Sequence, residues 1–179
     1  MKYNAYKKYG SARERGVTIM INEKPINLYY GDLLPGIGQS QFDLHELKGL
    51  MVCLWGECRG EQQDAIECVT QVIMNRSMDD RPEWPNSVSG VIEQPKQFSF
   101  FNKEHRNIRA KIIEDYMGWV KVVQYGLPIY LHGSTEWPCN MYWYHDDTIA
   151  PPHWTDKLTL FKKIGHLSFY CDGAPDYYA

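Results

Sequence analysis

Two acids in the first half of the chain, Glu57 and Glu61, are separated by a short segment that contains a glycine. The segment reads Gly56-Glu57-Cys58-Arg59-Gly60-Glu61. Low dielectric disfavours the charged form of a carboxyl group, so a partly buried acid in a cleft can donate a proton near neutral pH. Protonation of the leaving oxygen is the step that a glycosidic bond needs in order to break. The segment therefore makes Glu57 a candidate proton donor for glycoside cleavage.

A purely structural role is the alternative for this segment. An acid at the start of a helix interacts favourably with the helix dipole, which would account for Glu61. Arg59 could pair with either acid. These six residues alone leave the catalytic and the structural interpretations open.

Two predicted helices flank the segment. Asp43 is a plausible N-cap, and apolar residues recur after it at helical spacing, which predicts a helix over 43–57. A second helical pattern of apolar residues predicts a helix over 62–78. Burial of both helices would hold Glu57 rigidly at the end of the first one, with its side chain able to face a cleft.

The rest of the chain predicts an α+β fold. A third helix is expected over 104–125, with a short helical turn over 87–93 and strands over 141–145, 159–163 and 167–171 that form a C-terminal β-sheet. The third helix should stop by Gly126-Leu127-Pro128 and bury one apolar face, made of Ile108, Ile112, Tyr116, Trp119, Val120 and Val123.

Several further motifs follow in a fixed order. They lie at 69–76, 84–92 and 94–100, and near the C-terminus as Tyr142-Trp143-Tyr144-His145, Pro151-Pro152-His153-Trp154 and a segment at 164–170. Together with the segment around Glu57, this order resembles the SleB-type cell-wall hydrolases, named for the spore cortex-lytic enzyme. The resemblance covers about 44–170. It implies a single domain with a lysozyme-like helical core and a small antiparallel sheet.

The resemblance also implies cleavage of peptidoglycan glycan strands at the β-1,4 bond between N-acetylmuramic acid and N-acetylglucosamine. In the family the first acid of the motif is the general acid/base, which is Glu57 here. The family is thought to act as lytic transglycosylases, which leave a 1,6-anhydro sugar. Such an enzyme needs one carboxyl group, because the acid protonates the leaving oxygen and then accepts the proton of the sugar's own C6 hydroxyl. A hydrolytic muramidase, a zinc amidase and a non-catalytic glycan-binding module are the alternatives.

Aromatic side chains form 14% of the chain and suit a groove for sugars, since rings stack on the C–H faces of a glycan. Alternation favours a core position for Phe98, Trp143 and Phe169. On a regular strand Tyr142 and Tyr144 would share one face. The expected substrate-binding residues are Glu61, Gln97, Phe98, Ser99, Tyr142, Tyr144, His145 and Trp154.

No metal site or cofactor is expected. His132, His145, His153 and His166 lie in the last third of the chain, but no HExxH motif or similar short ligand pair accompanies them. Five cysteines without a framework spacing are expected to be reduced thiols.

Length and composition complete the expectations. With 179 residues and 44% hydrophobic residues, the chain can bury one good core, which we expect over 43–173 before a short tail at 174–179. Residues 1–42 form an extension whose first 24 residues hold six basic and two acidic side chains and whose pattern at 17–30 suggests a β-hairpin. No apolar run has membrane-spanning length, and the N-terminus lacks the pattern of a signal peptide. We expect a monomer that binds peptidoglycan and neither nucleic acid nor membrane, and that waits in a bacterial host cytoplasm as a phage endolysin.

Overall fold

A computed structural model describes residues 16–21, 24–29, 44–98 and 108–177 of the chain. The chain divides into two compact units, Met1–Leu47 and Lys48–Ala179. In the first unit β1 (Gly16–Ile21) and β2 (Lys24–Tyr29) pair in an antiparallel hairpin, with Gly16 opposite Tyr29 and Ile21 opposite Lys24. The sequence suggests a hairpin at about these positions in the N-terminal extension.

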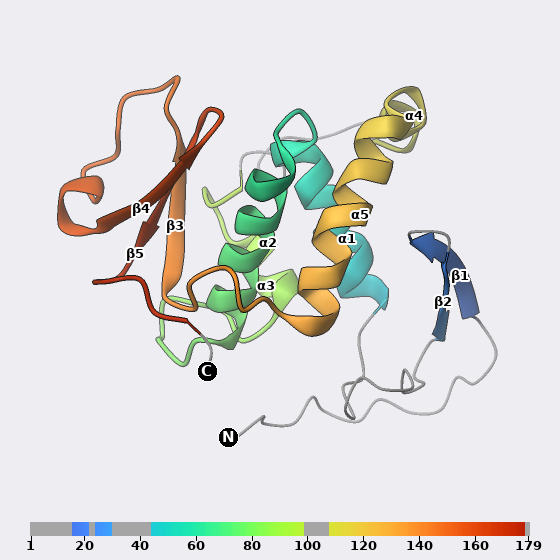
Figure 1. Ribbon diagram of the computed structural model, residues 1–179, viewed down its shortest axis with the longest axis horizontal. Helices are drawn as coiled ribbons and strands as arrows, with labels where there is room; N and C mark the ends of the chain where they lie inside the picture. Colours follow the sequence, from blue (N-terminus) through green and yellow to red (C-terminus); the bar gives the residue numbers. More distant parts are fainter. Residues whose placement is uncertain (1–15, 22–23, 30–43, 99–107, 178–179) are drawn as a thin grey trace. The chain divides into compact units, whose positions relative to one another are not determined.

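The remaining elements are helices followed by a sheet (Figure 1). The helices are α1 (Leu44–Cys58), α2 (Gln63–Met78), α3 (Val88–Glu93), α4 (Ile108–Glu114) and α5 (Tyr116–His132). The strands are β3 (Met141–Asp146), β4 (Thr159–Ile164) and β5 (Leu167–Cys171), and a short 3₁₀ turn η1 (Thr155–Lys157) precedes β4. The predicted α+β class is confirmed, and the first two helices begin and end within one residue of their predicted bounds.

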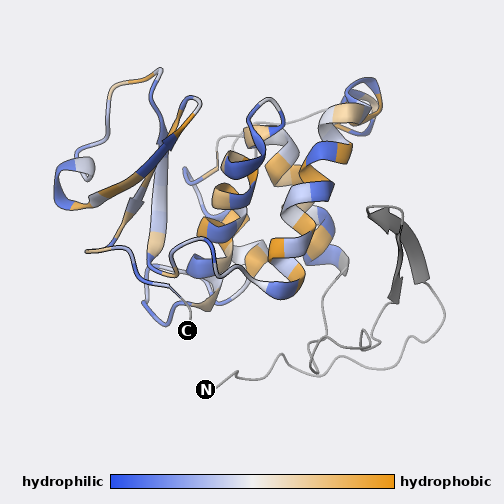
Figure 2. Cartoon of the chain, viewed as in Figure 1, coloured by the Kyte–Doolittle hydropathy of each residue, from blue (hydrophilic) through white to orange (hydrophobic). Residues whose placement is uncertain are grey.

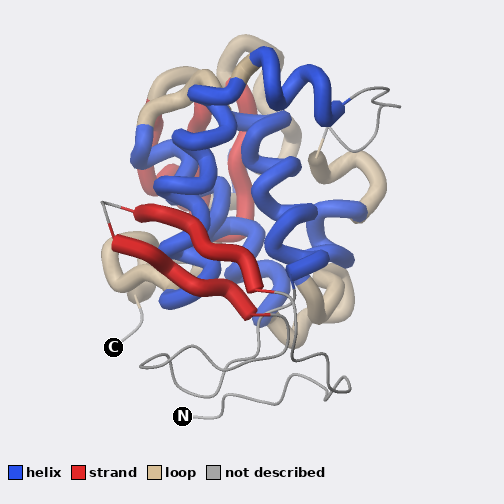
Figure 3. Tube along the Cα trace, turned by 90° about the vertical axis from the view of Figure 1, so that its right-hand side faces the viewer, coloured by secondary structure: helices blue, strands red, loops and turns tan. Residues whose placement is uncertain are grey.

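Helix α2 forms the centre of this unit. It lies between the three-stranded sheet on one side and α1 and α5 on the other (Figure 1), and the helices stand in front of the sheet in the turned view of Figure 3. Its side chains are buried on nearly every face, from Ala65 and Ile66 to Arg76 and Ser77. The outer helices instead carry hydrophobic and hydrophilic stripes (Figure 2), as expected of helices that bury one face.

The predicted third helix differs from the observed one. The structure breaks it at Asp115, whose carboxylate Oδ1 accepts a hydrogen bond of 3.2 Å from the Gly118 N–H and so caps α5. The helix then continues through Pro128 and ends at Gly133, which has a φ of 69°. The predicted stop at Gly126 is wrong, because Gly126 has a packing role instead of a capping role.

The predicted buried face of this helix is also wrong. Tyr116 is 63% exposed. The buried residues of α5 include Gly118, Val122 and Gly126, which follow one another at intervals of four. Helix α5 therefore approaches its neighbours along a stripe of small residues, which a search for large apolar side chains does not detect.

The sheet has the strand order β3-β5-β4 and is antiparallel throughout. Its central strand β5 is buried along its whole length. Strands β4 and β5 meet in a tight turn at Gly165, which has a φ of 59°. Strand β3 carries an irregularity between Met141 and Trp143, beyond which Tyr144 pairs with Phe169. This β-bulge determines where several site residues point.

Candidate active site

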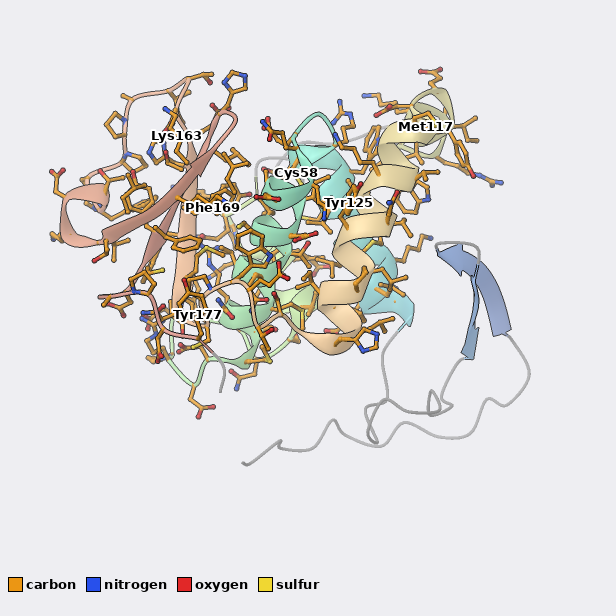
Figure 4. The ribbon with its side chains drawn as sticks, in the orientation of Figure 1. Cys58, Met117, Tyr125, Lys163, Phe169 and Tyr177 are labelled. Carbon is orange, nitrogen blue, oxygen red and sulfur yellow. The ribbon has the colours of Figure 1, made fainter. Side chains whose placement is uncertain are left out.

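Glu57 lies in the last turn of α1 and is half-buried. Two neighbours on the same helix, Cys53 and Cys58, are buried, and Figure 4 shows Cys58 at this end of α1. Burial first, and the Glu57 carboxylate second, raise the pKa of both thiols and of the Tyr144 hydroxyl. The carboxylate of Glu57 is therefore within electrostatic reach of Tyr144, a residue of β3. Helix α1 thus holds Glu57, and β3, on the other side of α2, carries the phenol of Tyr144 within its electrostatic reach.

Arg59 makes contacts that hold the structure together at the end of α1. Its Nε lies 3.0 Å from Oδ2 of Asp115, its guanidinium covers the Trp55 ring at 4.4 Å, and its Nη1 donates to the Trp55 carbonyl at 3.0 Å. Asp115 also accepts a hydrogen bond of 2.9 Å from the Trp55 indole. Arg59 thus ties the end of α1 to the junction of α4 and α5, and neither acid of its own segment is among these partners.

Glu61 lies in the loop after α1 and contacts a different part of the molecule from Arg59. A Cβ placed on Gly165 would overlap Oε2 of Glu61, so this carboxylate lies directly against the β4–β5 turn. Lys121 of α5 donates a hydrogen bond to the Glu61 backbone carbonyl. The contacts join the loop after α1 to both α5 and the sheet. They support the structural interpretation of Glu61, whose place as a substrate contact stays a prediction.

Tyr144 points into the space between the sheet and the helices. Its ring lies 5.7 Å from the ring of Phe169 and 6.4 Å from that of Phe98. Phe98 and Phe169 are fully buried, and Figure 4 labels Phe169 where the sheet faces α2. The core position expected for both is confirmed. Phe98 has no exposed surface to offer a sugar, and its ring packs near that of Tyr144 instead.

The bulge in β3 changes the alternation expected for this strand. The Arg81 guanidinium lies 4.2 Å from the ring of Tyr142 and 5.7 Å from that of Trp143, so these consecutive side chains meet the same partner. Trp143 is half-buried and packs edge-on against Trp84 at 6.1 Å. Sequence alternation placed Tyr142 and Trp143 on opposite faces, and the extra residue of a bulge is the reason that it does not hold here.

His145 and Trp154 belong to a second aromatic cluster. His145 is 8% exposed, stacks on Tyr170 at 5.8 Å and lies 6.0 Å from the Trp154 ring. Its Nε2 is 3.3 Å from the Tyr170 hydroxyl and 3.4 Å from Oδ1 of Asp147. The structure therefore brings these two predicted residues together, with the histidine beneath the surface.

Gln97 is exposed, and its side chain is nevertheless fixed, because its Oε1 accepts a hydrogen bond of 3.0 Å from Nη1 of Arg76. Ser99 lies outside the described residues. Sequence reasoning did not single out Arg76. The signal was present, since Arg76 follows Val69, Val72 and Ile73 at helical spacing and so falls on the buried face of α2.

Glu57 lines neither of two hollows that open on the described part of the chain. One of about 540 Å³ lies at the end of α2 and one of about 460 Å³ lies along the start of α5. The first is lined by Asn75, Met78, Asp79, Asp80, Arg81, Pro82, Cys139 and Tyr142. The second is lined by Arg59, Asp115, Met117, Gly118, Val120, Lys121, Gln124 and Tyr125.

The described residues offer neither a grouped set of metal ligands nor a membrane-spanning helix. Within 44–98 and 108–177, no three His, Cys, Asp or Glu side chains are grouped so as to hold a metal ion. None of the described helices combines the length and the apolar character needed to cross a membrane.

Comparison with known proteins gives consistent matches. The model of a family described as Cell Wall Hydrolase matches residues 60–170, a range that contains Glu61 and begins three residues after Glu57. The spore cortex-lytic enzyme of Bacillus subtilis (strain 168) is 26% identical over an alignment of 134 residues that covers 72% of this chain and 38% of that enzyme. The chain thus spans well under half of this relative's length.

Solved structures match the fold over most of the chain. The catalytic domain of the germination-specific lytic transglycosylase SleB from Bacillus anthracis aligns with a TM-score of 0.52 and 23% identity, covering 78% of this chain and 99% of that domain. The catalytic domain of the Bacillus cereus SleB protein aligns with a TM-score of 0.50 and 22% identity, covering 79% and 99%. These alignments confirm the predicted fold, a helical core with a small antiparallel sheet. The family match covers more than half of the chain, and the protein belongs to the cell wall hydrolase family.

Proposed function

We propose that this protein cleaves the glycan strands of peptidoglycan as a lytic transglycosylase, with Glu57 as its single general acid/base. The observation that carries the proposal is the position of Glu57, half-buried at the end of a core helix and within electrostatic reach of the Tyr144 hydroxyl. Membership of the cell wall hydrolase family supports the substrate class. The Bacillus anthracis domain that shares the fold is described as a lytic transglycosylase, which supports the reaction type.

The chemistry requires one carboxyl group in two protonation states. Protonated Glu57 donates its proton to the oxygen that leaves the muramic acid C1, and positive charge develops on the sugar ring. The resulting carboxylate then accepts the proton of the C6 hydroxyl as that oxygen attacks C1, which closes the anhydro ring and returns the acid to its first state. The Glu61 carboxylate is held against Gly165, and this position supports a mechanism that does not need a second acid.

The bond proposed for cleavage is the β-1,4 bond between N-acetylmuramic acid and N-acetylglucosamine. Tyr142, Tyr144, Gln97, Ser99, Trp154 and His145 are proposed to lie along the strand or to support the side chains that do. Tyr142 and Trp154 are half-buried, so part of each ring is available to a sugar.

Digestion of purified Gram-negative peptidoglycan tests the proposal. Wild-type protein and Glu57→Gln are compared, and the released muropeptides are weighed by mass spectrometry. Products one water lighter than the hydrolysed fragments, absent with Glu57→Gln, are the expected result. Reducing-end products would show a hydrolytic muramidase, and cleavage that survives in Glu57→Gln would overturn the site. Activity lost only with a chelator would favour the amidase alternative, whereas strand binding without any cleavage by the wild type would favour a binding module.

A monomeric phage endolysin, held in the host cytoplasm until it is released to the cell wall, remains our proposal for the biological setting. Cell lysis on co-expression with a membrane-permeabilising protein, and not without it, is the expected outcome. A sedimentation experiment on the purified chain would give its oligomeric state.

A further inference from the structure

We infer that Arg76 is a positioning residue for the glycan-binding face, which it serves by holding the exposed Gln97 side chain against the bulge of β3. The inference rests on the proposed function and adds a residue to it. Arg76 itself is 4% exposed, so it acts through its neighbours and does not touch the substrate.

The guanidinium of Arg76 joins segments that are far apart in the sequence. Its Nε donates a hydrogen bond of 2.7 Å to the Tyr142 carbonyl, and its Nη1 donates one of 3.0 Å to Oε1 of Gln97. Its plane covers the Trp84 ring at 4.5 Å, and the Phe98 ring lies at 5.9 Å. One side chain of α2 thereby fixes β3, the loop before α3 and the segment after α3 relative to one another.

The bulge gives Arg76 a backbone partner that a regular strand would not offer. Successive carbonyls of a strand point in opposite directions, yet Met141 and Tyr142 both present theirs to α2. Asn75 donates to the Met141 carbonyl at 2.8 Å and to the Pro138 carbonyl at 2.9 Å, while Arg76 donates to the Tyr142 carbonyl. The bonds of Asn75 end in the core. Those of Arg76 extend to an exposed side chain, which distinguishes its role from simple attachment of the strand.

The charge of Arg76 makes this arrangement costly. Among the described residues, no carboxylate lies within 4.0 Å of its guanidinium, and burial lowers its pKa to about 10. The group therefore stays charged at neutral pH, and the described residues give it no carboxylate partner. A buried charge without an ion pair is destabilising, so a neutral side chain would serve better if packing were the only purpose.

The position of Arg76 also connects it to the proposed acid. Its charge acts on the hydroxyl of Tyr144, and the same hydroxyl is within electrostatic reach of Glu57. Arg76 thus holds Gln97 by a hydrogen bond while its charge acts on Tyr144. Loss of that constraint should weaken glycan binding and leave the acid in place.

The test measures binding and cleavage separately. Affinity for soluble, uncross-linked glycan strands is measured in the Glu57→Gln background, and KM and kcat in the active enzyme. Arg76→Lys keeps the charge but cannot bond the Tyr142 carbonyl and Gln97 together. We expect it to raise Kd and KM roughly tenfold and to change kcat by less than about threefold. Gln97→Ala should have a similar effect, and the double variant should bind no more weakly than either single one.

Variants at Gln97 keep the test decisive if Arg76→Lys does not fold. Gln97 is exposed, and Gln97→Glu retains the oxygen that Arg76 bonds, so it should bind strands far better than Gln97→Ala does. Gln94→Ala is the matched control, because Gln94 lies in the same segment and bonds the Glu83 carbonyl at 2.9 Å instead of Arg76. It should leave Kd within about twofold of the parent.

Three results would overturn the inference. Unchanged Kd and KM in folded Arg76→Lys, with only a lower unfolding temperature, would show a structural role alone. Additive effects of Arg76→Lys and Gln97→Ala would show that Gln97 acts independently. Equal loss of binding in Gln97→Glu and Gln97→Ala would show that the bond to Arg76 is irrelevant. A wild type that neither binds nor cleaves strands would reject the proposed function and the inference with it, whereas an active wild type beside unaffected variants would reject the inference alone.

Discussion

Arg59 and Asp115 form an ion pair of 3.0 Å that joins the end of α1 to the junction of α4 and α5. Asp115 also caps α5 and accepts the Trp55 indole N–H. We expect Asp115→Ala to lower the free energy of unfolding by about 1–2 kcal/mol, most of it from the lost cap, because an exposed ion pair contributes little. Urea unfolding followed by circular dichroism measures the change. Asp115→Asn keeps an oxygen for the cap and should lose less than half as much, and equal losses would show that the charge dominates.

The two acids of the motif should respond differently to the same chemical change. Glu57→Gln removes the proton donor and is expected to lower the rate of strand cleavage about 10²- to 10⁴-fold. Glu61→Gln keeps the shape of a side chain that lies against Gly165, and it should cost less than about tenfold. Initial rates on the same peptidoglycan preparation give the comparison. A loss in Glu61→Gln as large as that in Glu57→Gln would assign the second acid a direct role.

Gly126→Ala should destabilise the protein although alanine is the better helix former. A Cβ at Gly126 would approach Cδ1 of Leu54 to 2.5 Å, and Leu54 is completely buried. Overpacking of this kind costs about 1–3 kcal/mol, more than the gain of up to about 1 kcal/mol from helix propensity. Thermal unfolding measures the difference. Gly60→Ala is the control, since no atom lies within 4 Å of its added methyl group, and it should leave the unfolding temperature nearly unchanged.

Asp147 predicts a pH dependence of stability. Hydrogen bonds from Lys163 first, and from Ser168, hold the pKa of Asp147 below its ordinary value of 3.8. A carboxylate with a lowered folded-state pKa stabilises the native state above that ordinary value, and the contribution disappears as the pH falls below it. Asp147→Asn should therefore be less stable than the wild type at pH 6 and nearly equal to it at about pH 2. A stability difference that stays constant over this range would contradict the prediction.

The thiols should differ in reactivity in the folded protein. Cys139 is half-buried, while Cys53, Cys58, Cys68 and Cys171 are at most 1% exposed. Burial, and then the carboxylate of Asp176, raise the pKa of Cys139, so its alkylation should be slow at neutral pH and accelerate as the pH rises. Mass spectrometry of the native protein should show one label at Cys139 before any other, and Cys139→Ser should abolish that early label. Early labelling of Cys58 would mean that the end of α1 opens readily.

Helices α1 and α2 could be predicted from the sequence because their apolar residues recur with a helical period. The limits of α1 and α2 followed from that pattern alone. The break at Asp115 could not, because the apolar pattern continues across it and the reason for the break is a set of tertiary contacts with Arg59 and Trp55. The continuation past Gly126 had the same cause, since what decides the role of that glycine is the proximity of Leu54.

For the candidate site, ordered motifs identified the segments but not the directions of their side chains. Glu57 was expected at the end of a rigid helix, and it lies there. At the bulge in β3, the side chains of Asn75 and Arg76 donate hydrogen bonds to backbone carbonyls of the strand. Both residues belong to α2, so alternation along the strand could not reveal the bulge. The contact of Glu61 likewise involves the turn at Gly165, more than a hundred positions further along the chain.

The strand order β3-β5-β4 leaves β4 with one unpaired edge. An open strand edge is a template for pairing with another molecule, and charged side chains on that strand oppose such growth. Lys162 and Lys163 lie side by side in β4, and their ammonium groups are held by Asp64 and Asp147. Two like molecules that approached through β4 would bring four lysines together. The charged side chains of β4 therefore act against edge-to-edge growth of this sheet.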